Sequence, residues 1–271
     1  MKKVILITGA SAGIGKDTAK LLAKEGHIVY GAARRVDKMQ ELVQYGVRLL
    51  AMDVTDDASM IKGVNEIIAA EKRIDVLVNN AGYGSYGAVE DVPLDEARYQ
   101  FEVNVFGLAR LIQLVLPHMR SQKSGRIINV SSMGGKFGEP HGAWYHATKF
   151  AVEGFSDSLR MELKQFGIDV VVVQPGAIKT EWSGIAGDNM LKTSGNTAYG
   201  NLARMHAKVL QNEEGKMGSE PIVIAEAIKK AIDANKPKTR YVAGALAKST
   251  LFMKSILPDR VFDSILMRML K

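Results

Sequence analysis

The amino-acid sequence predicts an α/β fold, a doubly wound parallel sheet of about seven strands with helices on both faces. Three observations predict it. Short β-branched segments recur along the chain, they are apolar almost throughout, and helix-length segments with 3.6-residue periodicity separate them. Strands that are apolar on both sides are covered on both faces, and repeated strand–helix units join parallel strands through right-handed crossovers.

Each expected element follows from its local pattern. The first strand is the apolar run from Val4 to Thr8, which ends at a glycine-rich turn, and a helix begins at Gly13. Strands are expected at 4–8, 28–32, 47–52, 76–79, 126–131, 169–174 and 240–243. Helices are expected where apolar residues recur at helical spacing, at 13–24, 57–71, 94–119, 145–166 and 221–235.

Two segments depart from this alternation. Residues 181–219 are rich in Gly, Asn, Ser and Lys, and we expect a flexible, lid-like connection there because connections of this length are usually functional or mobile. Residues 245–271 form a strongly apolar C-terminal extension. No linker, repeat or low-complexity tract divides the chain, so we expect one domain over residues 1–271.

Composition narrows the functional classes. The chain has 271 residues, 46% of them hydrophobic and 24% charged, as in ordinary globular proteins. The absence of cysteine excludes disulfides and thiolate catalysis. The net charge of +7 indicates a solvated basic surface, since no dense Lys/Arg run with interleaved aromatics favours nucleic acid. No apolar stretch approaches the ~18 residues of a membrane span, and we expect a cytoplasmic protein.

A glycine-rich turn follows the first strand. Gly9, Ser11, Gly13, Ile14 and Gly15 lie between the strand and the helix, with the spacing Gly-x-x-x-Gly-x-Gly. Glycines let the backbone approach a pyrophosphate, and the helix N-terminus supplies free N–H groups and partial positive charge. The flanking strand and helix favour a Rossmann-type dinucleotide site over a turn without a ligand.

The end of the second strand indicates which dinucleotide is bound. Ala33 stands where an acidic residue would bind the ribose 2′-hydroxyl of NAD, and Arg34 follows. A guanidinium beside a small residue suits a 2′-phosphate. The alternative is a pair of surface arginines, but the missing acid and the added cation agree, so we expect NADP. Neither His118 nor His141 has partners at metal-ligand spacing, so no metal is expected.

Catalytic groups are expected at the carboxyl end of the sheet. Tyr145 and Lys149 are four residues apart and therefore share a helix face. A nearby ammonium stabilises a phenolate, so we expect the pKa of Tyr145 to be lowered. Ser132 follows the strand at 126–131, and Asn104 lies within the long helix, where a buried amide requires hydrogen-bond partners.

Together these motifs resemble the short-chain dehydrogenase/reductase family, from Lys3 to about Val242. The helix from Tyr145 to Leu163 resembles the branch acting on steroids, retinoids and acyl compounds. The resemblance implies a catalytic set of Asn104, Ser132, Tyr145 and Lys149. It implies cofactor contacts from Gly9, Ser11, Gly13, Ile14, Gly15, Arg34, Asp53, Val54, Asn80, Ala81, Gly82, Tyr145, Lys149, Pro175, Gly176, Ile178 and Thr180.

The resemblance also implies a reaction. Tyr145 would be the general acid or base, with Lys149 lowering its pKa and holding the nicotinamide ribose. Ser132 would bind the reacting oxygen, and Asn104 would hold a water of the proton relay. We therefore expect an NADP-dependent interconversion of a carbonyl and an alcohol. The alternative is a non-catalytic NADP-binding sensor or scaffold on the same fold.

Other features set weaker expectations. His146 is rotated about 100° from Tyr145 around the helix, so we expect packing or surface exposure, and Trp144 is either a packing residue or a substrate contact. The apolar segments at 181–219 and 245–271 favour a lipophilic substrate. The extension either packs on the domain, which we favour, or touches anionic membrane through its interleaved basic residues. The resemblance implies a homodimer or homotetramer through helices 94–119 and 145–166.

Overall fold

The computed structural model describes residues 2–212 and 218–270, and its centre is a single parallel sheet. Within these residues, seven strands pair in the order β3-β2-β1-β4-β5-β6-β7. They are β1 (Val4–Thr8), β2 (Ile28–Ala33), β3 (Arg48–Ala51), β4 (Val76–Asn79), β5 (Gly125–Val130), β6 (Ile168–Pro175) and β7 (Arg240–Ala243). The predicted doubly wound α/β fold is confirmed, and the strand order reverses between β1 and β4.

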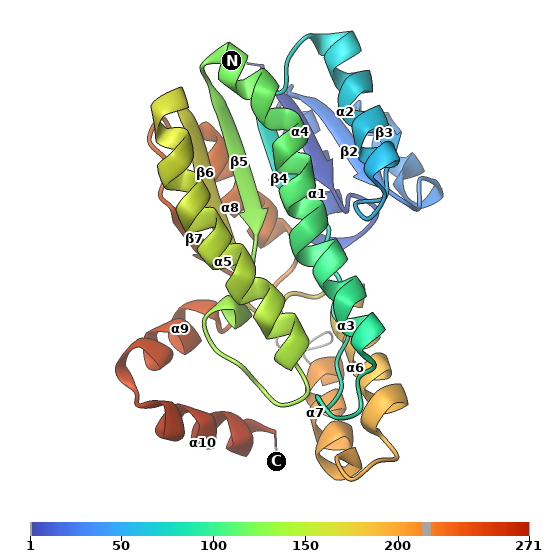
Figure 1. Ribbon diagram of the computed structural model, residues 1–271, viewed down its shortest axis with the longest axis vertical. Coiled ribbons are helices and arrows are strands. Elements are labelled where there is room, and N and C mark those ends of the chain that lie inside the picture. Colours follow the sequence, from blue (N-terminus) through green and yellow to red (C-terminus); the bar gives the residue numbers. More distant parts are fainter. Residues whose placement is uncertain (1, 213–217, 271) are drawn as a thin grey trace.

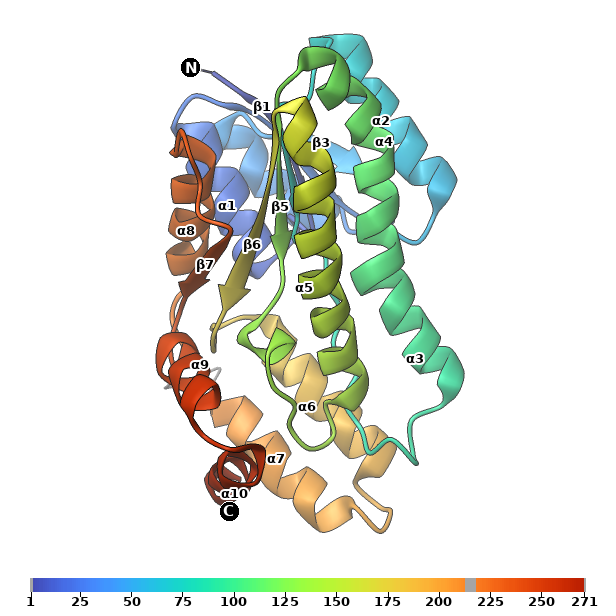
Figure 2. The ribbon, with the colours of Figure 1, turned by 60° about the vertical axis from the view of Figure 1, so that its left-hand side comes forward.

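Helices cover both faces of the sheet (Figure 1; Figure 2). One face carries α1 (Gly13–Lys24), α8 (Ile222–Asp233) and the 3₁₀ segment Asp37–Tyr45. The other carries α2 (Asp57–Glu71), α4 (Gly107–Gln122) and α5 (Ala143–Leu163), which a 3₁₀ turn extends to Phe166.

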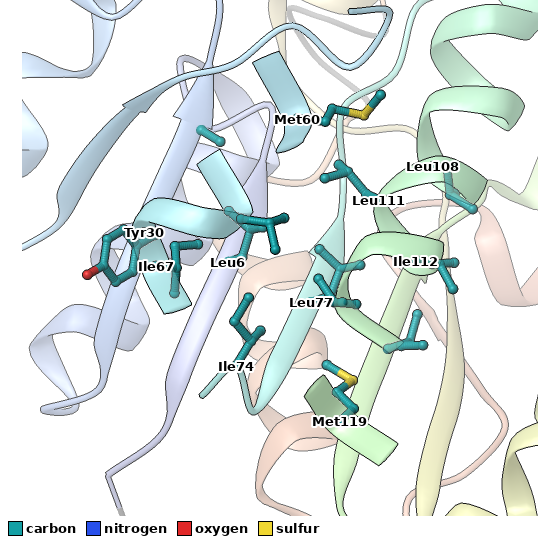
Figure 3. Packing of buried hydrophobic residues seen from close by; sticks show 14 of the residues in the cluster. Leu6, Tyr30, Met60, Ile67, Ile74, Leu77, Leu108, Leu111, Ile112 and Met119 are labelled. Carbon is teal, nitrogen blue, oxygen red and sulfur yellow. The ribbon is translucent and has the colours of Figure 1, made fainter. Parts of the chain in front are cut away.

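Neighbouring residues of each strand point to opposite faces of the sheet. Because helices cover both faces, both sets of side chains are buried. Along β1, Leu6 packs toward α2 and α4, whereas Ile5 and Ile7 pack toward α1 and α8. Figure 3 shows the first of these cores, where Leu6 and Leu77 meet Leu111 and its neighbours. Side chains of this kind each contribute about 1.5–3 kcal/mol when fully buried. The unbroken apolar sequence of β1 therefore specifies a central strand.

The long helix expected at 94–119 is interrupted. It consists of α3 (Leu94–Phe101), a π-helical turn (Glu102–Phe106) and α4. The extra residue of a π turn changes the direction of the side chains that it carries, and such turns are frequent at functional sites. Asn104 lies in this turn, and its side chain is hydrogen-bonded to Tyr83 in the loop after β4.

The segment 181–219 differs from its expected flexible connection, because it contains α6 (Glu181–Ser194) and α7 (Gly200–Asn212). The side chain of Thr180 caps α6 by accepting from the Trp182 N–H at 3.4 Å. The two helices bury Met190 and Leu210 in one cluster. Burial against another segment therefore stabilises helices whose glycine, asparagine and serine content weakens their local propensity. Residues 213–217 of the segment lie outside the described residues.

The C-terminal extension forms two further helices, α9 (Ala247–Ile256) and α10 (Asp259–Met269). Phe262 is only 1% exposed and packs on Phe137 with ring centroids 5.4 Å apart, while Phe252 and Ile256 face solvent. With α6 and α7, these helices lie beyond the carboxyl ends of the strands (Figure 2). Within the described chain, no helix is both long and apolar enough to cross a membrane.

Candidate active site

A cavity of about 780 Å³ opens at the carboxyl ends of the strands. The loops after β1, β2, β4, β5 and β6 line one part, and side chains from α7, α9 and α10 line another. In open α/β sheets ligands bind in the crevice where the strand order reverses, which here lies between β1 and β4. Its position and size therefore mark it as the candidate active site.

The glycine-rich turn forms one wall of the cavity. Gly9 and Gly13 have φ values of +68° and +51°, a conformation that other residues rarely adopt. A Cβ on Gly15 would lie 2.3 Å from the Gly9 carbonyl oxygen, so any side chain would force the turn apart. The N-cap of α1 is Ala12, which supplies no capping side chain. The first N–H groups of the helix are thus available to an anion, which fits a dinucleotide pyrophosphate.

Two arginines follow β2 at the far end of this wall. The Arg34 guanidinium donates to the Tyr99 hydroxyl at 2.9 Å, and the Arg35 guanidinium lies 3.5 Å from Ser11 Oγ and 3.6 Å from Glu181. Ala33 at the strand end supplies no carboxylate. Arg35 was not among the predicted cofactor residues, although its position beside Arg34 could have suggested it.

The predicted cofactor residues converge on this cavity, with one exception. Gly15 lies behind the turn and does not line the cavity, although its lack of a side chain permits the turn. The residues that do line it are Gly9, Ser11, Gly13, Ile14, Arg34, Asp53, Val54, Asn80, Ala81, Gly82, Tyr145, Lys149, Pro175, Gly176, Ile178 and Thr180.

Hydrogen bonds to Thr8 join the two loops beside the point where the strand order reverses. Its Oγ1 accepts from the N–H groups of Asn80 at 3.1 Å and of Ala81 at 3.0 Å. In return, the Asn80 side-chain amide donates to the Thr8 carbonyl at 2.9 Å. The end of β1 and the loop after β4 are therefore held in one geometry.

Three predicted catalytic residues meet at the centre of the cavity. The hydroxyl groups of Ser132 and Tyr145 are hydrogen-bonded to each other. Lys149 Nζ donates to the Val130 carbonyl at 3.0 Å and lies 5.7 Å from the centroid of the Tyr145 ring. Residues from the end of β5 and from α5 thus present two hydroxyls and an amine to the same space.

Asn104, the fourth predicted catalytic residue, lies behind this group rather than on the cavity surface. Its side chain is 2% exposed. Its amide accepts from the Tyr83 N–H at 2.7 Å and donates to the Tyr83 carbonyl at 2.8 Å and to Thr148 Oγ1 at 3.0 Å. Asn104 therefore ties the loop after β4 to α5.

Burial shifts the pKa of Tyr145 in the direction opposite to the one expected. It raises the pKa of Tyr145 to about 12, and the hydrogen bond from Ser132 offsets only part of this. Burial also lowers the pKa of Lys149 to about 8, against the opposing charge of Glu153. The expected lowering of the Tyr145 pKa is therefore wrong for this structure, because desolvation and the charge of Glu139 raise the pKa by more than the Ser132 hydrogen bond lowers it. At neutral pH Tyr145 carries its proton and can donate it.

The cavity is also lined by residues that sequence reasoning did not assign. Trp182 and Tyr86 lie 4.9 and 5.7 Å from the Tyr145 ring, measured between centroids. His146 is buried and packs on the Phe137 and Tyr145 rings, as expected, and it also lines the cavity, whereas Trp144 does not line it. Glu139 and His206 also face the cavity, and no local motif marks them.

Comparison with known proteins agrees with this architecture. The family model described as short chain dehydrogenase matches residues 3–189. The chain is 40% identical to a 3-ketodihydrosphingosine reductase of Bacteroides thetaiotaomicron, over 96% of this chain and 95% of that protein. It is 36% identical to an NADPH-dependent 3-dehydrocapnine reductase of Ornithobacterium rhinotracheale, over 98% and 96%. A short-chain dehydrogenase structure from Streptomyces avermitilis superposes with a TM-score of 0.80 at 34% identity, covering 94% of this chain and 93% of that one.

The fold and these matches define an oxidoreductase. The chain belongs to the short-chain dehydrogenase/reductase family, as its sequence motifs predicted.

The glycine turn gives a direct test of the dinucleotide site. We expect Gly15→Ala to weaken NADPH binding by about 1–3 kcal/mol, the usual cost of overpacking, because the new Cβ would meet the Gly9 carbonyl. Gly154→Ala is the matched control, since a Cβ there meets nothing within 4 Å. Isothermal titration calorimetry with NADPH measures both variants. Equal dissociation constants for the two would contradict the assigned cradle.

Proposed function

We propose that this protein is an NADP(H)-dependent oxidoreductase that interconverts a ketone and an alcohol on a lipophilic substrate. One observation carries the proposal. The hydrogen-bonded Ser132 and Tyr145, with Lys149 beside them, lie where the glycine cradle and an apolar wall share a single cavity. A hydride donor bound at the cradle and a lipophilic carbonyl held by the wall would therefore meet at a proton donor.

The apolar wall supports a lipophilic substrate. It is formed by Phe137, Val209, Leu210, Met253, Phe262, Ile265, Leu266, Met269 and Leu270. Val209 and Leu210 of this wall belong to α7, which together with α6 we assign the part of a lid. Its residues from Met253 to Met269 belong to α9 and α10, so we propose that the extension packs on the domain rather than on a membrane. The names of the two curated relatives, a 3-keto and a 3-dehydro reductase, support reduction of a ketone.

In the proposed mechanism the substrate oxygen lies between the Ser132 and Tyr145 hydroxyls. When bound, the nicotinamide supplies or accepts the hydride. Ser132 and Tyr145 donate hydrogen bonds to the oxygen as negative charge develops on it, and Tyr145 Oη then releases its proton to that oxygen. In the reverse direction Tyr145 takes the proton from the alcohol.

The other members of the catalytic set support these two hydroxyls. Lys149 would hold the nicotinamide ribose and place positive charge near the phenolate that forms after proton transfer. Asn104 would keep the loop after β4 and α5 in register, as its hydrogen bonds to Tyr83 and Thr148 indicate, and would hold the water of the relay. The presence of all four groups favours an enzyme over a non-catalytic NADP-binding scaffold.

The cation pair after β2 supports NADP over NAD. Arg34 and Arg35 are exposed, and Arg35 lies beside Ser11, so they can bind a 2′-phosphate without a large desolvation cost. Ala33 leaves space and adds no repelling charge. The relative from Ornithobacterium rhinotracheale is named as NADPH-dependent, which agrees.

Exposed apolar side chains on the outer helices support the expected homodimer or homotetramer. Phe106 is 55% exposed, Phe150 47% and Met161 70%. They lie on the π turn before α4 and on α5, which run side by side on one face of the sheet (Figure 1). We expect sedimentation equilibrium to give a multiple of the 29.5 kDa chain mass. A charged residue at Met161 should shift this equilibrium toward the monomer, and a monomeric wild type would contradict the assignment.

Replacement of the proton donor tests the mechanism. Tyr145→Phe keeps the ring and removes the hydroxyl, so we expect at least a ~100-fold loss of turnover with NADPH binding retained. Consumption of NADPH is followed at saturating cofactor with a panel of lipophilic ketones. Tyr199→Phe is the control, because Tyr199 is exposed and lies outside the cavity. Turnover in Tyr145→Phe that matches this control would refute the mechanism.

Substitutions at the end of β2 test the preference for NADPH over NADH. In the double variant Ala33→Asp and Arg34→Gln, the new carboxylate repels a 2′-phosphate and can bind a free 2′-hydroxyl. We expect the ratio of kcat/KM for NADPH to that for NADH to fall ~10- to 100-fold, as for loss of a hydrogen bond to a charged group. Arg98→Gln, which removes an exposed arginine paired with Asp95, should leave the ratio unchanged. A wild-type protein that already prefers NADH would overturn the assignment.

A further inference from the structure

A buried carboxylate that the proposed mechanism does not use lies one helical turn beyond Lys149. Glu153 follows Lys149 by four residues and Tyr145 by eight on α5, so the three side chains share one face of the helix. Only 3% of Glu153 is exposed, and it does not line the cavity. Any part that Glu153 has in the reaction must therefore act through a neighbouring residue.

Donors from three other elements hold this carboxylate in one position. Glu153 Oε1 accepts from Gln174 Nε2 of β6 at 2.9 Å. Its Oε2 accepts from Arg240 Nε of β7 at 2.9 Å and lies 3.0 Å from Lys136 Nζ, in the loop after β5. Both oxygens are thus fixed, and the position of the negative charge on α5 is fixed with them.

The turn after Ser132 closes the space over Glu153 and Lys149. This 3₁₀ turn, Met133–Gly135, packs tightly on α5 at its last residue, where a Cβ on Gly135 would lie 3.0 Å from Glu153 Cγ and 3.1 Å from the Lys149 carbonyl oxygen. Residues four apart on a helix have Cβ atoms about 5–6 Å apart. Solvent therefore screens the charge of Glu153 only weakly along the short path to Lys149.

Lys149 needs such a charge because its own surroundings disfavour the ammonium form. It is 6% exposed, and burial lowers its pKa to about 8, while the charge of Glu153 acts in the opposite direction. The Val130 carbonyl accepts from Lys149 Nζ at 3.0 Å but carries no net charge. Without an anion nearby, a buried lysine releases its proton at a lower pH.

The other titratable groups on the surrounding elements do not supply this anion. They are Tyr145, His146 and Asp157 on α5, Glu139 before it, Lys136 after β5 and Arg240 on β7. Glu139 lies 3.6 Å from His146 Nε2, and Asp157 accepts from Arg240 Nη2 at 2.7 Å. Each of these two carboxylates thus has a basic partner of its own. The rest are cations or, in the case of Tyr145, uncharged at neutral pH.

We propose that Glu153 is a positioning residue of the proposed reaction, a fixed buried carboxylate that keeps Lys149 in its ammonium form. The inference rests on the proposed function, in which Lys149 places positive charge near the phenolate that Tyr145 becomes after proton transfer. A neutral amine at Lys149 would not stabilise that phenolate. Glu153 would thus determine up to which pH Lys149 and Tyr145 can act together.

The ionisation of Lys149 can be measured in the protein without cofactor or substrate. In protein labelled with ¹³C at the lysine ε-carbons, NMR follows each lysine through its titration, and the variant Lys149→Arg identifies the signal. We expect a midpoint near pH 8 in the wild type. In Glu153→Gln, which keeps the size of the side chain and removes its charge, the midpoint should fall by at least ~1 pH unit.

Two variants of neighbouring residues set the sign and the specificity of this effect. Lys136→Gln removes a cation that opposes the ammonium and should raise the midpoint. Asp157→Asn is the matched control, because it removes a carboxylate that also binds Arg240 but leaves Glu153 in place. Its midpoint should stay within ~0.3 pH units of the wild type.

The pH dependence of activity gives the second measurement. If the reaction requires the ammonium form, kcat/KM for ketone reduction with NADPH falls as the pH rises through the Lys149 midpoint. A midpoint ~1 pH unit lower in Glu153→Gln makes kcat/KM ~10-fold smaller than in the wild type at about pH 9 and less than ~2-fold smaller at about pH 6. A residue that only supported the fold would reduce activity equally at both pH values.

The outcomes separate this inference from the proposed function. A wild type that reduces no ketone with NADPH would refute the proposed function, whereas the NMR midpoints would still test the effect of Glu153 on Lys149. If the wild type reduces ketones but Glu153→Gln keeps its midpoint or its pH profile, the inference alone is overturned. Should Glu153→Gln fail to fold, Lys136→Gln decides, because the side chain of Lys136 is 38% exposed and its replacement leaves the core intact. An unchanged or lower midpoint in that variant would overturn the inference.

Discussion

The hydrogen bonds between Thr8 and the loop after β4 are the constraint on which the site depends. A doubly wound sheet opens a crevice where its strand order reverses, and without a tie the two loops beside that crevice would be free to separate. Thr8 Oγ1 accepts from two successive N–H groups, and Asn80 returns a hydrogen bond to the Thr8 backbone. The loop after β4 then continues to Tyr83, where Asn104 holds it to α5, the helix of Tyr145 and Lys149.

Burial of Lys149 beside Tyr145 is unfavourable for folding. Both Tyr145 and Lys149 lie below 10% exposure, and the pKa values of both move toward the neutral forms. A buried lysine held by a single carbonyl contact does not favour folding at neutral pH, because its charged form loses hydration. The same enclosure strengthens every hydrogen bond offered to a developing oxyanion. Stability is thus reduced at the position where the proposed electrostatic catalysis would require a dry environment.

Polar groups mark three separate parts of the cavity. Free helix N–H groups and two arginines mark the proposed cofactor end, two hydroxyls mark the centre, and the Glu139 carboxylate marks the proposed substrate end. Since polar groups in an apolar cavity fix orientation more than they add affinity, these points would determine how a ligand lies. The helices α6, α7, α9 and α10 supply the apolar surface between them (Figure 2).

The sequence by itself determined the features that depend on neighbouring residues. The strand at Val4–Thr8, the glycine turn after it, the missing acid at Ala33 and the spacing of Tyr145 and Lys149 are all local patterns, and the structure places them as they predict. Helix α1 has the predicted bounds because its turn and its apolar face lie within one short segment.

Only the tertiary structure decided the features that depend on distant contacts. The helices α6 and α7 form because they bury each other's side chains, which weak local propensity does not reveal. The π turn at Asn104 arises from one extra residue that has no local pattern. Glu139 meets His206 across 67 positions of sequence, and Tyr145 has a raised pKa because several segments exclude water from it. Spacing can place two side chains on one helix face, but the solvent that surrounds them is determined by the whole chain.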